Sequence, residues 1–256
     1  MERMSSLFWR NPPQQQVVMG LLRVLHEQGP PVRILDIGAS SGEQITGYAM
    51  LLRDEYGSRW RDRFEITCLD PSSARCESFR RGRYRKATLY RMPEVFRERY
   101  IGQRQLDNND DWFQLLDLSL VECIRIVQSR FEDYTDGTCD LVFAQNVLFH
   151  MEPAAADACV RRAHGLLRPG GYFVCAGRHP EAASQLEALG FLPVLHDVIR
   201  VYESWSLRKT HLDSRFALKP YDPHDAALSY KIGSVFERPP WNFFGHSGQG
   251  AIPCHP

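Results

Sequence analysis

An acidic residue followed by two glycines is the feature of this sequence with the clearest chemical meaning. Asp36 lies near the end of the apolar, β-branched run 32–37, Gly38 and Gly42 follow it, and an apolar segment, 45–52, comes next. This order is typical of a buried parallel strand, a tight turn and a helix, as in nucleotide-type βαβ units. Glycine lets the backbone bend sharply and approach a ligand without a Cβ. The spacing matches neither G-x-G-x-x-G nor a P-loop, because no Lys-Ser or Lys-Thr follows Gly42.

Polar residues also end two other strand-like runs. Asp70 follows the run 64–69, and Gln145 and Asn146 follow the run 139–144. In open α/β sheets, ligands bind beyond the carboxyl ends of the strands. A carboxylate at that edge can accept hydrogen bonds from ligand hydroxyls, although an Asp-Pro pair such as Asp70-Pro71 also begins many turns. We therefore expect these side chains to contact a ligand.

The elements that must position these residues alternate along the chain. Apolar spacing predicts helices over 14–28, 43–55, 72–81, 154–167 and 181–189, and strands over 32–37, 64–69, 124–127, 139–144, 172–176, 191–195 and 199–205. Residues 84–120 are polar and arginine-rich, and we interpret them as an insertion. Residues 209–256 form a tail that contains prolines and aromatics, which we expect to lie beyond the last strand. Alternating strands and helices predict an α/β fold with a mostly parallel sheet covered on both faces.

Composition limits the class of protein. The 256 residues include 43% hydrophobic ones, enough for one large α/β domain with additions. The basic and acidic residues number 31 each, so no general nucleic-acid footprint is present. No apolar run approaches the roughly 18 residues of a membrane helix, and no signal-peptide core is seen, so we expect a cytoplasmic protein. Seven cysteines without a C-x-x-C pair indicate small buried hydrophobes rather than zinc ligands, and the dispersed histidines predict no metal site.

Two resemblances follow from these motifs. The D-x-G-x-x-x-G turn resembles motif I of class I methyltransferases, which bind S-adenosylmethionine (SAM). Over about residues 5–208 the chain also resembles the CheR-type methyltransferases, which esterify glutamate side chains of bacterial chemoreceptors. The similar blocks are 6–12 to T-x-F-F-R-D-P, 38–44 to G-C-S-T-G-E-E, 68–70 to A-T-D, 82–84 to G-x-Y, 99–100 to R-Y-F, 139–150 to F-D-x-I-F-C-R-N-V-L-I-Y, and 167–172 to L-x-P-G-G-Y. The resemblance implies a Rossmann-like fold with a seven-stranded sheet and SAM as cofactor.

The resemblance also implies roles in cofactor binding. Glu43 would accept from the amino group of SAM, unless it only favours the helix dipole. Asp70 would accept from the ribose hydroxyls. Ser6 would reach the methionine carboxylate or act as a helix N-cap, and Phe131 would flank the adenine or belong to the core. The expected cofactor-binding set is Ser6, Asp36, Gly38, Ser40, Gly42, Glu43, Asp70, Arg130, Phe131, Gln145 and Asn146.

The expected catalytic set is Arg10, Tyr84, Tyr100 and His150. The family resemblance sets Arg10 against an acceptor carboxylate, which its planar guanidinium suits, while a solvated arginine is the alternative. The two tyrosines would line the acceptor side. His150 is either a satisfied polar residue or a base, and a base is required only for an amine or hydroxyl, since a carboxylate is already ionised. The reaction expected is in-line displacement at the sulfonium methyl, without a metal.

The chain departs from the family pattern at several points. Gln145 stands where Arg is usual and His150 where Tyr is usual, and we expect no counterpart of the family's N-terminal helical domain. We expect an N-terminal helical segment over 1–31, a SAM-binding domain over 32–208 with a subdomain inserted at 84–120, and an extension over 209–256. The extension is expected either to enclose the acceptor or to form a strap across the sheet.

The function predicted is methyl transfer to a carboxylate, or to an amine or hydroxyl, of a small molecule or peptide, in a biosynthetic role and without nucleic-acid or membrane partners. Three alternatives stay open. The chain could be a cyclase or aminocarboxypropyl transferase that releases methylthioadenosine, a chemoreceptor glutamate methyltransferase, or a SAM-binding regulator without catalysis.

Overall fold

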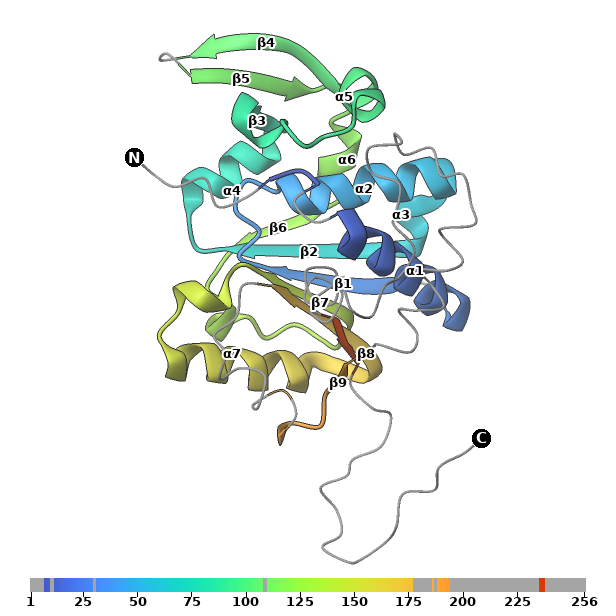
Figure 1. The fold of residues 1–256 in the computed structure, drawn as a ribbon, viewed down its shortest axis with the longest axis vertical. Helices are drawn as coiled ribbons and strands as arrows, with labels where there is room; N and C mark the ends of the chain where they lie inside the picture. Colours follow the sequence, from blue (N-terminus) through green and yellow to red (C-terminus); the bar gives the residue numbers. More distant parts are fainter. Residues whose placement is uncertain are drawn as a thin grey trace, which may run out of the picture.

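The computed structural model describes residues 7–9, 12–29, 31–107, 110–176, 186, 188–193 and 235–237. They form a seven-stranded sheet in the order β6-β2-β1-β7-β8-β10-β9 (Figure 1). The strands are β1 Val32–Ile37, β2 Phe64–Asp70, β6 Arg125–Gln128, β7 Cys139–Gln145, β8 Leu167–Ala176, β9 Leu192–Pro193 and β10 Val235–Glu237. The first five in sheet order are parallel, and β10 is antiparallel to both neighbours. The predicted mostly parallel α/β sheet is confirmed.

Helices cover both faces of the sheet, as expected from its nearly continuous apolar strands. They are α1 Pro12–Gln28, α2 Glu43–Tyr56, α3 Trp60–Arg63, α4 Ser73–Arg80 and α7 Pro153–Leu166. Because successive strand residues point to opposite faces, Ile34 packs in one core with α1 and α2, whereas its neighbour Leu35 packs in a second core with α7. Figure 1 shows α1, α2 and α3 on one side of the sheet and α7 on the other. This arrangement leaves the carboxyl edge of the parallel strands available for a ligand.

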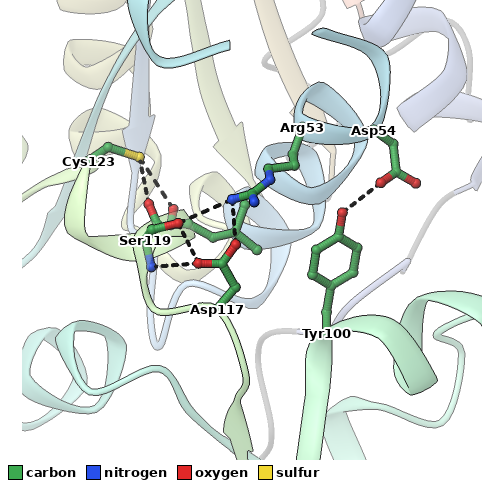
Figure 2. Close-up of polar contacts among 7 residues, drawn as sticks. Arg53, Asp54, Tyr100, Asp117, Ser119 and Cys123 are labelled. Atoms are coloured by element: carbon green, nitrogen blue, oxygen red, sulfur yellow. Dashed lines mark hydrogen bonds and ion pairs between the residues drawn. The ribbon is translucent and has the colours of Figure 1, made fainter. Parts of the chain in front are cut away.

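The insertion predicted at 84–120 is a small antiparallel sheet in the order β3-β5-β4, seen above α2 in Figure 1. Its elements are β3 Arg83–Arg85, α5 Glu94–Tyr100, β4 Ile101–Asp107 and β5 Asp110–Leu115, followed by α6 Ser119–Glu122. Polar contacts join it to the end of α2 (Figure 2): the Tyr100 hydroxyl donates to Asp54 over 2.6 Å, and the Arg53 guanidinium pairs with Asp117. Short 3-10 turns complete the fold at Gly57–Arg59, Lys86–Thr88, Phe131–Asp133 and Leu148–His150.

The C-terminal region corrects one expectation. We expected 209–256 to lie beyond the last strand, but β10 belongs to it and pairs with β8 at Phe236↔Phe173 and with β9 at Phe236↔Pro193. A strand of three residues is too short to show a period of two, and its partners lie far away in sequence. The predicted strand at 199–205 and most of the predicted helix at 181–189 lie outside the described residues.

Two further sequence expectations bear on the fold. Cys68, Cys139 and Cys175 are buried and form no disulfide within the described residues, as expected for small apolar side chains. Within the described residues, no helix has the length and apolar character to cross a membrane.

Candidate functional site

The turn after β1 adopts the strained backbone that its glycines predict. Gly38, Ser40 and Gly42 have φ values of +69°, +57° and +82°. The amides of Gly38 and Ala39 donate to the carbonyl of Leu69 at 2.8 and 2.9 Å, so the turn is fastened to the end of β2. A Cβ on Gly38 would lie 2.7 Å from a methyl carbon of Val147, which is closer than atoms can pack. The glycines therefore let the turn fit between β2 and the segment after β7.

Asp70, the last residue of β2, holds this turn with its side chain. Its Oδ2 accepts from the backbone amide of Ser40 and its Oδ1 from that of Ser72, both at 2.9 Å. These two bonds orient a carboxylate that is only 4% exposed. Each carboxylate oxygen has two lone pairs, so each can accept a further hydrogen bond from a ligand.

Asp36 lies on the adjacent strand and is buried to the same extent. Burial, together with the nearby charge of Asp70, raises the pKa of Asp36 to about 8. Because a buried carboxylate without a compensating partner is costly, this side chain is mainly protonated at neutral pH. The neutral form of Asp36 is therefore favoured by its burial and by the carboxylate on the neighbouring strand.

A cavity of about 630 Å³ opens at this edge of the sheet, and its size is within the range of small-molecule sites. Asp36 and Asp70 both line it, as do residues that follow β1, β2, β6 and β7. The complete lining is Leu7, Asp36, Ile37, Gly38, Ala39, Ser40, Gln44, Leu69, Asp70, Pro71, Arg75, Ser129, Arg130, Phe131, Glu132, Gln145, Asn146, Val147, His150 and Met151. The turns predicted to meet at the carboxyl edge thus enclose one space.

The side of the cavity after β6 is built from Arg130 and Phe131. Phe131 lines the cavity and also packs in the core that contains α7, with the Arg162 guanidinium 5.5 Å from its ring centre. The two expected roles of Phe131, as a ligand contact and as a core residue, are compatible, because one face of the ring can contact a ligand while the other packs in the core. Arg130 is exposed at the cavity wall.

The side of the cavity formed by the segment after β7 carries polar side chains. Gln145 donates from Nε2 to Oε1 of Gln14 over 2.7 Å, which ties α1 to the cavity. Asn146 has a left-handed backbone, with φ at +54°, a conformation in which asparagine is tolerated better than most residues. His150 is exposed and also lines the cavity. Two amides and one imidazole thus supply hydrogen-bonding groups on this side.

Four of the predicted site residues lie outside the cavity lining. Gly42 packs beneath the turn against Phe79, and Glu43 is buried in the first turn of α2. The Tyr84 hydroxyl is hydrogen-bonded to Thr46 at 2.8 Å, and that of Tyr100 donates to Asp54. Both rings are buried where the insertion meets α2, so their hydroxyls are engaged in joining these two parts (Figure 2 shows Tyr100). This placement does not support an acceptor-side role for either tyrosine.

Ser6 and Arg10 lie outside the described residues, so the structure does not place them. The sequence interpretation missed several lining residues, among them Leu7, Gln44, Arg75, Glu132 and Met151. Gln44 and Glu132 each follow directly a residue that we did select. The signal that could have identified more of the lining residues is a position shortly after the end of a strand. The sequence interpretation applied that signal to too few positions.

The cavity has features that fit SAM. The oriented carboxylate of Asp70 can accept hydrogen bonds from ligand hydroxyls, and the buried Asp36 lies beside it. The glycine turn lets the backbone approach a ligand closely. Among the described residues, no three histidine, cysteine, aspartate or glutamate side chains are grouped as metal ligands would be.

Comparison with known proteins identifies sequences and structures that are similar to this chain. The chemotaxis protein methyltransferase of Borreliella burgdorferi is 23% identical to this chain over 158 residues. The aligned region covers 59% of this chain and 53% of that protein. Chemotaxis protein methyltransferase 2 of Vibrio cholerae is 21% identical, with 65% and 57% covered. The chain thus spans little more than half the length of these relatives. A magnesium protoporphyrin IX methyltransferase of Synechocystis with bound SAM shares 16% identity over 71% of this chain and 70% of that one, with a TM-score of 0.40.

The family model described as the SAM-binding domain of CheR methyltransferase matches residues 4–187, which is well over half of the chain. The chain therefore belongs to the CheR family of SAM-dependent methyltransferases, and SAM is its cofactor.

Proposed function

We propose that this protein transfers the methyl group of SAM to a carboxylate of a peptide or small molecule. The observation that carries the proposal is the cavity at the carboxyl edge of the sheet, where Asp70 is oriented by two backbone amides within a SAM-binding family domain. Two relatives are chemotaxis protein methyltransferases by name, which supports a carboxylate in a protein as one acceptor class.

The residues of this chain act mainly by binding and orientation. Asp70 accepts hydrogen bonds from hydroxyls, and the turn of Gly38 to Ser40 brings the backbone against the ligand. SAM would supply an electrophilic methyl group on its sulfonium, and S-adenosylhomocysteine would be the leaving group when the acceptor takes that methyl. An acceptor carboxylate is ionised at neutral pH and needs alignment rather than a base. His150 would then position the acceptor or exclude water, and would become a base only for an amine or hydroxyl.

Binding is the first test. Calorimetry should detect SAM with the intact chain, and Asp70→Ala should weaken its affinity about tenfold or more, because a hydrogen bond to a charged group contributes about 1.5–3 kcal/mol. Glu77→Ala is the matched control, since Glu77 is an exposed acid on α4 that pairs with Arg81 outside the cavity. Equal affinities of the two variants would remove Asp70 from the cofactor site.

The acceptor is tested with SAM that carries a labelled methyl group, offered together with glutamate-rich peptides and small carboxylic acids. Methyl esters release methanol in mild base, whereas methylated amines and ethers do not. We expect S-adenosylhomocysteine and a base-labile product. A base-stable methyl product would exclude the carboxylate, and methylthioadenosine in place of S-adenosylhomocysteine would exclude methyl transfer.

Arg10→Ala should lower turnover and preserve SAM affinity if the resemblance assigns this residue correctly.

A further inference from the structure

Asp36 and Asp70, two of the three acids that line the cavity, differ in the number of hydrogen bonds that they accept. Asp70 accepts two backbone hydrogen bonds. The Asp36 carboxyl forms no hydrogen bond or ion pair with any residue that the structure describes, although it is 4% exposed and faces the same cavity. An unpartnered buried acid in a ligand cavity avoids the cost of a bare charge by keeping its proton.

The surroundings of Asp36 favour this neutral form. Asp70 on β2 disfavours a second negative charge, and burial acts in the same direction, so that together they raise the pKa of Asp36. Tyr48 on α2 and Cys68 on β2 are also buried beside it, and their own raised pKa values keep both side chains protonated and uncharged, so neither can act as a counter-charge for an Asp36 carboxylate. The other ionisable residues of the lining are Arg75 after β2, Arg130 and Glu132 after β6, and His150 after β7.

We propose that Asp36 releases its proton when SAM binds, so that the cavity exchanges a proton for the positive charge of the cofactor. This inference rests on the proposed binding of SAM in this cavity. SAM carries a sulfonium and an ammonium against one carboxylate, so it brings a net positive charge into a space that already holds Asp70. The O–H bond of Asp36 breaks, its electron pair stays on the carboxylate as the counter-charge, and the proton passes to solvent.

The exchange makes two quantitative predictions. From a pKa of about 8, roughly 0.9 proton should be released per SAM bound at pH 7. Because only the deprotonated form pairs with the cofactor, affinity should increase with pH below that pKa, by about ninefold from pH 6 to pH 7.

The experiment is calorimetry of SAM binding at pH 7 in two buffers that differ in ionisation enthalpy, which counts released protons directly. The intact chain should release close to one proton. Asp36→Asn, which keeps the size and neutrality of the protonated acid, should release none and should bind equally at pH 6 and pH 7. Glu132→Gln, at a second acid of the same cavity, should still release the proton. S-adenosylhomocysteine, which lacks the sulfonium and therefore carries no net charge, should cause much less proton release than SAM, and equal release with both ligands would contradict an exchange for the positive charge of the cofactor.

Either of two proton-counting results would overturn the inference. One is SAM binding by the intact chain without proton release, and the other is unchanged release by Asp36→Asn, which would move the proton to another group such as His150. If Asp36→Asn does not fold, the pH dependence of the intact chain still decides, since equal affinity at pH 6 and pH 7 refutes the exchange. Failure of the intact chain to bind SAM at all would instead refute the proposed function.

Discussion

Replacing Gly42 by alanine tests whether the turn after β1 requires glycine for its backbone, for its packing, or for both. Gly42 has a φ of +82°, and a Cβ built there would lie 2.3–2.4 Å from three carbons of the Phe79 ring. Phe79 on α4 is 1% exposed, so its ring has little room to move. The left-handed backbone should cost alanine about 1–2 kcal/mol. The forced contact should add about 1–3 kcal/mol, as overpacking of a core does.

The chain offers a matched control for the backbone cost. Gly170 has a φ of +80°, and a Cβ there would meet no atom within 4 Å. Gly170→Ala should therefore cost only the backbone component, and Gly42→Ala should be less stable than it by about 1–3 kcal/mol. Urea unfolding of both variants measures this difference, provided the slopes with denaturant agree with that of the unmodified chain.

A second substitution separates the contact with Phe79 from other causes. Phe79→Leu makes the core smaller under the turn, so it should destabilise the native chain and yet relieve part of the cost of Gly42→Ala. The double variant should be more stable than the sum of the single effects predicts, by more than the roughly 0.5 kcal/mol that independent sites show. Additive effects, or equal stability of Gly42→Ala and Gly170→Ala, would refute the packing argument.

Further predictions concern two tyrosines that lie outside the cavity lining and the C-terminal strand β10. Tyr84→Phe should destabilise the fold by about 1–3 kcal/mol because it leaves the buried Thr46 hydroxyl without its partner, and it should preserve SAM affinity and turnover; a large loss of turnover at unchanged stability would restore the acceptor-side role. Tyr100→Phe should cost less, about 0.5–1.5 kcal/mol by thermal unfolding, since Asp54 keeps its ion pair with Arg99; a loss of SAM affinity would contradict this. Truncation after Arg208 removes β10 from between β8 and β9, so it should strongly lower the melting temperature; an unchanged melting temperature would show that this pairing contributes nothing.

The local part of the site could be predicted from the sequence. The strand, glycine turn and helix over residues 32–56 involve neighbours in the chain, and the signals for each are local: apolar β-branched residues, glycines at positive φ and an apolar helical face. The same reasoning placed Asp70 and Gln145 at strand ends, and parallel pairing then brought those ends to one edge.

Only the tertiary structure decided which partners these residues meet. Gln145 bonds to Gln14 across 131 positions, Tyr84 to Thr46 across 38, and Tyr100 to Asp54 across 46. Contacts between distant positions leave no periodic signal in the chain, and the same holds for β10 inside the main sheet. The protonation state of Asp36 also depends on the tertiary structure. Its residue type indicates a ligand site, but its proton depends on burial and on the charge of Asp70, which only the packing of β1 against β2 brings together.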